Sequence, residues 1–362
     1  MPLKSQRERD EEKLEQKIIY FPWYVNNFVE GKSNKLSPST LLGYLFDYEI
    51  FFGWLIAEAG CPVEKIKDVP LSFLENLDLK TADTYPKFLE KQNVTGSTRR
   101  KQNNEKTIAR KMASLKSLFS YLQNFAEDEN HMPLLKRNVI EKIEFSTTKI
   151  DIQDQAKIIH HKILVSEEAV EEFRRFIAYD YGRQPGLNKR HLSWYEDNRE
   201  RDTAIVSLIL GSGLRVNEVV NLILIDIDWE ARRVLVTRKG KKLQSVPFSM
   251  RSKLDLEEYM RIRNSRYQPP ASETALFLTK GGKPMTRNAM QKMVNKYSRA
   301  YGKPLSVHIL RHTFGTQLYK KKKNLRLVQD ILGHSDPKTT TLYTHIRNDE
   351  QNHTVDDMDS LE

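Results

Sequence analysis

The chain has 362 residues, and its 59 Lys and Arg outnumber its 48 Asp and Glu, which gives a formal net charge of +11 at pH 7. A net positive charge of this size favours a polyanionic binding partner. With 39% hydrophobic and 30% charged residues, the composition excludes both a disordered chain and one embedded in a membrane. The length exceeds what one hydrophobic core usually supports, so two domains are expected.

The single cysteine, Cys61, excludes an internal disulfide and a zinc site built on cysteines. Residues 1–19 mix acidic and basic side chains without an apolar core, unlike a secretory signal. The longest apolar run, 50–57, is much shorter than the roughly 20 residues that a membrane span needs. We therefore expect a cytoplasmic protein.

The first third of the chain shows helical patterns only. Aromatic residues at 20–28 indicate a short amphipathic element. Ser37 followed by Pro38 is typical of a helix start, and the apolar residues that follow recur at spacings of three and four, which indicates a helix with one buried face. The longer helices predicted here cover 37–59, 79–92 and 104–125.

Between residues 98 and 116, at the start of the third of these helices, Glu105 is the only acid among the charged residues, and all the others are basic. A helix face that is merely solvated usually mixes both signs, so this one favours contact with phosphates, although a solvated face remains the alternative. The residues predicted to bind DNA or RNA are Arg99, Arg100, Lys101, Lys106 and Arg110.

The remainder of the chain predicts helices with one small sheet. A polar segment, 146–165, lacks a clear period and is expected to be a linker. Ser166 begins a helix, and the polar stretch 180–199 predicts a surface loop. The other predicted elements are an apolar helix at 202–210 closed by Gly211 and Gly213, a helix from 215, a hairpin of strands 233–238 and 244–247, a third strand at 275–279, and helices from 287 onward.

Three separated segments carry residue types that bind phosphate or transfer protons: GLRVNE at 213–218, HILRH at 308–312 and LGHSDPKTTTLYTH at 332–345. Each alone has an ordinary explanation. An arginine can pair with a nearby carboxylate, a His-x-x-Arg pair simply shares one helix face, and a glycine can end a helix before a surface tyrosine. Their joint presence, in this order, is much harder to explain in that way.

Together the segments resemble the motifs of the tyrosine recombinases, the phage-integrase family, and within it the Xer type. The likeness spans about 167–346, and the runs 22–25, 237–240 and 342–351 are similar to the single-recombinase Xer group of low-GC Gram-positive bacteria. It implies a mainly α fold with a small antiparallel β-sheet, in which a helical SAM-like core-binding domain precedes an α+β catalytic domain. The expected parts are a charged leader (1–19), the core-binding domain (20–145), a linker (146–165), the catalytic domain (166–346) and an acidic C-terminal tail (347–362).

The resemblance also assigns the nucleophile and the anion-binding groups. Tyr343 attacks the scissile phosphate to form a 3′-phosphotyrosyl bond and free a 5′-hydroxyl, which stores the bond energy without ATP. Arg215 and Arg311 bind the negative charge of the transition state, because guanidinium groups stay charged and bind phosphate oxygens bidentately. Glu218 is expected to support these groups rather than to catalyse.

Proton transfer is assigned by the same resemblance. His308 helps to take the proton from the attacking tyrosine, and His334 donates a hydrogen bond to a phosphate oxygen. Lys239, at the tip of the predicted hairpin, reaches the DNA and protonates the leaving 5′-oxygen, although Lys241 and Lys242 are close enough in sequence to take this role. No cofactor and no metal ion are implied.

The implied function is site-specific recombination that converts chromosome dimers to monomers at a dif-like site. The implied partners are double-stranded DNA, three further copies of the chain in a homotetramer on two sites, and a septal DNA translocase of the FtsK type. The acidic tail either docks on a neighbouring subunit or is solvated. Four alternatives stay open: an integrase of a phage or mobile element, a monomeric type IB topoisomerase, a DNA-binding protein without catalysis, and a metal-dependent nuclease. The last would use histidines 308, 312, 334 and 345, which lack carboxylates at ligand spacing.

Overall fold

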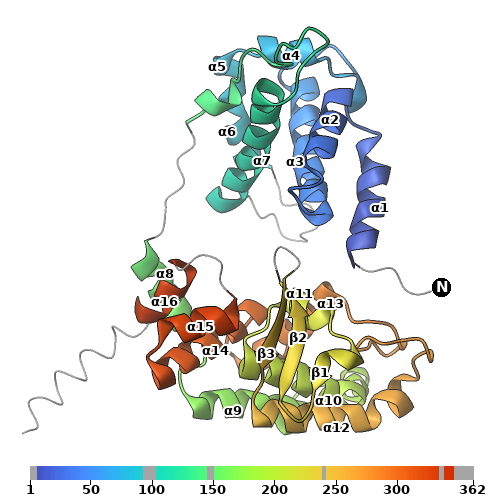
Figure 1. The fold of residues 1–362 in the computed structure, drawn as a ribbon, viewed down its shortest axis with the longest axis vertical. Helices are drawn as coiled ribbons and strands as arrows, with labels where there is room; N and C mark the ends of the chain where they lie inside the picture. Colours follow the sequence, from blue (N-terminus) through green and yellow to red (C-terminus); the bar gives the residue numbers. More distant parts are fainter. Residues whose placement is uncertain (1–5, 93–102, 145–150, 239–241, 334–337, 346–362) are drawn as a thin grey trace, which may run out of the picture. The chain divides into compact units, whose positions relative to one another are not determined.

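The computed structural model describes residues 6–92, 103–144, 151–238, 242–333 and 338–345, and the chain divides into an N-terminal unit, 1–149, and a C-terminal unit, 150–362 (Figure 1). The N-terminal unit is helical, and the C-terminal unit combines helices with one three-stranded antiparallel sheet. The mainly α fold with a small sheet is as predicted.

Helices make up the whole framework of the N-terminal unit. They are α1 (Gln6–Ile18), α2 (Trp23–Lys32), α3 (Pro38–Ala57), α4 (Leu71–Asn76), α5 (Leu79–Ala82), α6 (Thr84–Lys91) and α7 (Glu105–Asn124), with 3₁₀ turns η1 (Ile66–Asp68) and η2 (Ile140–Lys142). The Ser37 hydroxyl accepts a hydrogen bond from the backbone N–H of Thr40 at 3.2 Å, which confirms the predicted start of α3.

The core of this unit is built on α3. Phe51, Trp54 and Tyr85 are buried, and the Phe51 ring lies edge-on to that of Tyr85 at 5.1 Å between centroids. In the described part of the chain, α3 is also the single helix long and apolar enough to cross a membrane by length and composition. Its burial among the other helices accounts for that apolar composition, as it does for core helices generally.

Most of the predicted charged leader, 1–19, forms helix α1. Arg7 and Glu11 pair one helical turn apart at 2.8 Å, and Leu14 and Ile18 pack against the core of the unit. The Nζ of Lys17 also lies 2.8 Å from a carboxylate oxygen of Glu49 on α3. With so few apolar contacts, α1 leaves only a weak periodic signal in the sequence.

Nine helices form most of the described C-terminal unit. They are α8 (Ile152–His160), α9 (Glu167–Arg175), α10 (Lys189–Ser212), α11 (Val216–Val220), α12 (Met250–Tyr267), α13 (Arg287–Tyr301), α14 (Val307–Lys322), α15 (Leu325–Leu332) and α16 (Lys338–His345), with short turns η3 (Phe176–Asp180), η4 (Tyr181–Arg183) and η5 (Leu224–Asp226). As predicted, Ser166 caps α9, where it accepts from the N–H of Ala169 at 3.1 Å.

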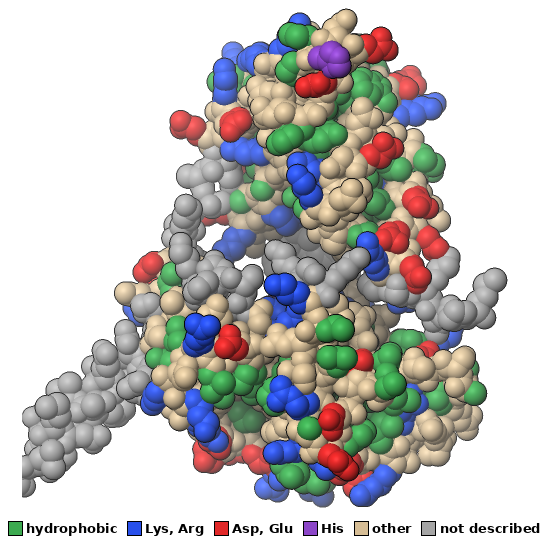
Figure 2. Space-filling view, viewed as in Figure 1, with side chains coloured by type: hydrophobic (Ala, Val, Ile, Leu, Met, Phe, Trp, Pro, Cys, Tyr) green, Lys and Arg blue, Asp and Glu red, His purple; other side chains and the backbone are tan. Residues whose placement is uncertain are grey.

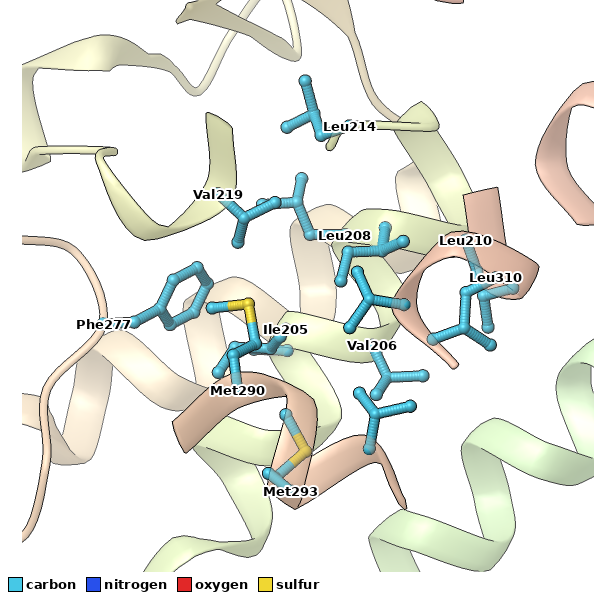
Figure 3. Packing of buried hydrophobic residues seen from close by; sticks show 14 of the residues in the cluster. Ile205, Val206, Leu208, Leu210, Leu214, Val219, Phe277, Met290, Met293 and Leu310 are labelled. Carbon is cyan, nitrogen blue, oxygen red and sulfur yellow. The ribbon is translucent and has the colours of Figure 1, made fainter. Parts of the chain in front are cut away.

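The C-terminal half of α10 is the centre of this unit. It carries the buried side chains Ile205, Val206 and Leu208, which pack with residues of α13 and α14 (Figure 3). The helix also lies against α12. Because every face of this half-helix is covered, its sequence is apolar throughout rather than periodic.

The sheet has the order β1 (Ile227–Asp228), β2 (Arg233–Thr237), β3 (Leu243–Pro247). Val234 on β2 pairs with Val246 on β3, so the predicted hairpin is present in the described residues. Both valines are buried, whereas Leu235, the next residue on β2, is exposed, as expected for alternating side chains on a strand. The predicted third strand at 275–279 is wrong. Ala275 and Leu278 form only isolated bridges, and the third strand is β1.

Two segments predicted to be linker and loop contain helices. Within 146–165, α8 buries Ala156 in a cluster with Tyr343 of α16. Within 180–199, Asn188 caps α10, which begins at residue 189 and runs without a break into the apolar half. The first half of α10 is largely exposed, and an exposed polar helix has no apolar period by which to recognise it.

Lys296 on α13 is a cation whose buried Nζ has no hydrogen-bond acceptor in the described part of the chain. Its Nζ lies 3.7 Å from the ring centre of Trp194 and 3.9 Å from that of Tyr297. Burial lowers the pKa of the ammonium to about 8, although Asp202 acts in the opposite direction. The fold therefore disfavours the charged form despite the contacts with aromatic rings.

Replacing this lysine by an apolar side chain should stabilise the C-terminal unit. We expect Lys296→Met to raise the free energy of unfolding at pH 7 by about 1–3 kcal/mol, with the exposed Lys292→Met as control. The gain is fully present below pH 8 and shrinks as the pH rises towards about 10.4, the usual lysine pKa, because the folded protein then loses the buried charge first. Urea denaturation at pH 7 and pH 10 measures this, and a loss of stability at pH 7 would contradict it.

Candidate active site

Glu218 organises the start of α11. Its carboxylate accepts two hydrogen bonds from Arg215, one from the backbone N–H at 2.8 Å and one from Nη1 at 2.8 Å. The side chain thus caps the helix and at the same time fixes the guanidinium of Arg215, the N-cap residue. Glu218 is buried, whereas 37% of the Arg215 side chain is exposed, so the guanidinium is available to a ligand.

Arg311, on α14, lies against the same carboxylate. Its Nη1 is 3.9 Å from Glu218 Oε2 and donates to the carbonyl of Gly213 at 2.6 Å, while its Nη2 donates to the carbonyl of Leu332 at 2.7 Å. Burial and the neighbouring Arg215 lower the pKa of the Arg311 guanidinium to about 10, so it is charged at neutral pH.

The carbonyls that hold the arginines come from two helix ends. Gly213 ends α10 and Gly333 ends α15, both in the left-handed region with φ of 67° and 63°. The carbonyl of Gly333 accepts from Arg215 Nη2 at 3.0 Å. A Cβ at Gly213 would lie 2.4 Å from the Phe314 ring, so both backbone conformation and space require glycine there.

A third guanidinium, that of Arg238 after β2, completes this cluster. Its Nη2 donates to the carbonyl of Ile331 at 2.7 Å, and its Nε lies 4.0 Å from Glu218. Its Nε and Nη1 are buried and have no hydrogen-bond partner among the described residues, and burial lowers its pKa. Sequence analysis did not select Arg238. It could have been suspected only from its place between the strand and Lys239.

A pocket of about 390 Å³ opens beside Arg215 and Arg311. It is lined by Arg215, His308 and Arg311, and its far wall comes from the exposed or half-buried Arg287, Gln291 and Asn295, one helical turn apart on α13. The structure thus brings together three of the predicted site residues from distant parts of the sequence. Burial, followed by the positive charge of Arg311, lowers the pKa of His308.

Tyr343 lies beside this pocket, on the inner face of α16. It is 1% exposed, and its hydroxyl is 3.2 Å from Nδ1 of His312. Burial raises the pKa of Tyr343 to about 12, against the lowering effect of Arg311 and Arg215. Sequence analysis named His312 only as a possible metal ligand. Its spacing of four from His308 on one helix is the signal that would place both on one face.

Comparisons with known proteins agree with this geometry. Residues 189–350 match the phage integrase family. Tyrosine recombinase XerS of Streptococcus pneumoniae (strain CGSP14) is 36% identical over 352 residues, which cover 96% of this chain and 98% of that protein. The chain belongs to the tyrosine recombinase family. The recombinase is accordingly an enzyme that exchanges DNA strands at specific sites, and DNA is its partner.

Solved structures show the same fold. The recombinase is similar to XerH site-specific recombinase bound to palindromic difH substrate in a post-cleavage complex, with a TM-score of 0.62, 20% identity, and coverage of 98% of this chain and 91% of that chain. It is also similar to Tn1549 transposon integrase in complex with transposon right end DNA, with a TM-score of 0.57, 17% identity, and coverage of 91% and 98%. These likenesses confirm the predicted fold class.

Several predicted site residues lie outside the described residues of the recombinase: Lys239, His334, Arg99, Arg100 and Lys101. Arg238, which precedes Lys239, and Gly333, which precedes His334, are close together, because a Cβ at Gly333 would lie 1.5 Å from Nη1 of Arg238. The residue before Lys239 therefore packs on the residue before His334. Among the described residues, no three His, Cys, Asp or Glu side chains are grouped so that they could hold a metal ion.

The two described residues of the predicted basic face differ in their surroundings. Arg110 donates to both carboxylate oxygens of Asp47, at 2.5 and 2.6 Å, and Asp47 is 2% exposed. Lys111 lies 3.8 Å from the same carboxylate. Lys106 is exposed at the start of α7. On the face drawn in Figure 2, basic and acidic side chains are interspersed. The charge of Arg110 is in part committed to the fold, because this side chain pairs with the buried Asp47.

Arg110→Gln and Lys106→Gln should therefore separate stability from DNA binding. We expect Arg110→Gln to destabilise the N-terminal unit by about 2 kcal/mol, since it leaves a buried carboxylate short of a partner. Lys106→Gln should leave the stability within about 0.5 kcal/mol and weaken DNA binding in a salt-dependent way. Thermal unfolding and DNA titration at two salt concentrations check this. Equal destabilisation by both changes would contradict the structural role of Arg110.

Glu218→Gln should impair DNA cleavage although Glu218 lies behind the arginines. The neutral amide cannot balance the charges of Arg215, Arg311 and Arg238, so the guanidiniums of Arg215 and Arg311 lose their fixed positions. A shift of about 1 Å in a catalytic group costs roughly 100-fold in rate. We expect covalent adduct formation to fall by about 10- to 100-fold, with a much smaller change in DNA affinity. The exposed Glu230→Gln is the matched control. An unaltered cleavage rate for Glu218→Gln would show that the carboxylate does not position the arginines.

Proposed function

We propose that the recombinase cuts and rejoins DNA through a 3′-phosphotyrosyl bond to Tyr343 and, in the cell, converts chromosome dimers to monomers at a dif-like site. The observation that carries the chemistry is the placement of Arg215 and Arg311 around one pocket, with a tyrosine hydroxyl held beside it. The likeness to XerS over nearly the whole chain supports the biological role.

The geometry suits a phosphodiester as the bound group. Each guanidinium carries five N–H donors, and only some of them are used by Glu218 and the helix-end carbonyls. The remaining donors of Arg215 and Arg311 can face the non-bridging oxygens, where negative charge grows in the transition state. His308 and Arg287 line the same pocket and add donors and positive charge.

The reaction that follows is balanced without an outside energy source. The phenolic oxygen of Tyr343 forms a bond to phosphorus as the bond from phosphorus to the 5′-oxygen breaks, and the phenolic proton passes to a histidine of α14, a step in which His308 is proposed to help. The leaving oxygen takes a proton, for which Lys239 is the proposed donor, and His334 is the proposed donor of a further hydrogen bond to the phosphate. Attack by a 5′-hydroxyl of a second strand reverses these steps and joins the strands.

The assembly is proposed on the same basis. Two duplex sites, each bound by two copies, would form a homotetramer, with the acidic tail at 347–362 as a candidate for contact between copies. A septal DNA translocase of the FtsK type is the proposed activator, and the cytoplasm is the proposed location. The basic residues of both units, +11 net over the chain, would supply the attraction for the duplex.

Covalent trapping tests the proposed chemistry. On a nicked suicide duplex that carries the recognition site, the wild-type protein should form a denaturation-resistant adduct, and Tyr343→Phe should form none, since only the hydroxyl is lost. The adduct should form equally well in EDTA. An adduct of equal yield with Tyr343→Phe would show that another residue is the nucleophile. The exposed Tyr179→Phe is a matched control for loss of a phenol.

Sequencing the DNA held in these adducts in cells tests the biological role. One chromosomal locus, with resolution of a two-site plasmid by the purified protein, is the expected result. Recovery of the ends of a mobile element would favour an integrase, and relaxation of supercoils without any site preference would favour a topoisomerase.

A further inference from the structure

The hydroxyl of Tyr343 is held in place by α14. Nδ1 of His312 lies 3.2 Å from it, and one turn later the backbone of Gly315 lies so close that a Cβ there would be 2.7 Å from the same oxygen. The His312 and Tyr343 rings lie 6.0 Å apart at 53°. The reacting oxygen of the proposed nucleophile is therefore in direct contact with an imidazole to which the family resemblance assigns no role.

We propose that His312 receives the phenolic proton when Tyr343 attacks the phosphate. This inference rests on the proposed function. As the bond from Oη to phosphorus forms, the phenolic proton passes to Nδ1 of His312, and the 5′-oxygen leaves with a proton from Lys239. When the 5′-hydroxyl attacks in the rejoining step, it gives its proton to Lys239, and His312 returns its proton to the departing phenolate oxygen, so the protein ends unchanged.

The charges around His312 favour this role. Along α14 it faces His308 and Arg311, and from α16 it faces Tyr343. Burial, followed by the effects of His308 and Arg311, lowers the pKa of His312 to about 4, so the imidazole is neutral at physiological pH. A neutral imidazole with its proton on Nε2 offers the lone pair of Nδ1 to the hydroxyl.

The nucleophile needs such an acceptor. With its pKa raised to about 12, the Tyr343 hydroxyl keeps its proton at neutral pH, and only the phenolate form attacks phosphorus well. His308 lies one turn earlier on α14, lines the pocket with the arginines, and stacks on His312 at 6.1 Å between ring centroids. It can therefore assist through His312, while His312 touches the reacting oxygen itself.

The test measures the pH dependence of cleavage by His312→Asn and His308→Asn in the full-length protein. The substrate is a duplex with the recovered recognition site and a 5′-bridging phosphorothiolate, whose thiolate leaves without a donated proton, so that proton removal from Tyr343 is isolated. Asn is chosen because it keeps an acceptor near the position of Nδ1 but cannot take a proton. DNA affinity and thermal unfolding of each variant are measured alongside.

For the wild type we expect a flat rate of adduct formation between pH 6.5 and 9. For His312→Asn we expect a loss of about 100-fold at pH 7 that shrinks about tenfold per pH unit, because hydroxide must then ionise the phenol. His308→Asn should lose activity without this slope. A His312→Asn profile parallel to the wild type, or the hydroxide-dependent slope in His308→Asn alone, would overturn the proposal. If the wild type itself forms no adduct at Tyr343, the proposed function fails instead.

Discussion

The active site depends on how three guanidinium groups are kept together in a nearly buried space. Like charges so close repel, and burial removes the water that would screen them. One carboxylate, that of Glu218, lies among Arg215, Arg238 and Arg311 and supplies the opposite charge. Carbonyls at the ends of α10 and α15 accept further hydrogen bonds from these arginines. At such helix ends the backbone acceptors have no partner within the helix, and the helix dipole is negative.

This constraint links parts of the C-terminal unit that are far apart in sequence. The arginine cluster forms where the end of α10, the start of α11, α14 and the end of α15 meet, because each contributes a group that the others hold. The same helix α14 then carries His312 and Gly315, which fix the hydroxyl of Tyr343. The proposed binding of phosphate and the placement of the proposed nucleophile would thus both result from one packing arrangement.

The sequence predicted correctly those helices and strands that leave a strong local pattern. Ser37 and Ser166 mark helix starts that the structure confirms, and alternation at residues 233–237 revealed a strand. It missed the helices whose surfaces are largely exposed, α1 and the first half of α10, because solvent imposes no apolar period. It also took 275–279 for a strand, where an apolar segment is buried without continuous pairing.

The same limits apply to the site. Residue types and order gave Arg215, His308, Arg311 and Tyr343, and the structure brings the first three to one pocket with Tyr343 beside it. Contacts that form only after folding could not be predicted from the sequence. The hydrogen bond between His312 and Tyr343 spans 31 residues and has no sequence signature. Asp47 on α3, which accepts hydrogen bonds from Arg110, lies 63 residues away and could not be predicted for the same reason.

The arginines are held largely by main-chain oxygens, and this has an evolutionary consequence. Carbonyls at positions 213, 331, 332 and 333 remain acceptors whatever side chains those positions carry, so mutation cannot delete them. Only the two glycines are restricted, by backbone conformation and space. The helices that end there can therefore diverge in sequence and adapt to new partners or target sites while the chemistry persists unchanged.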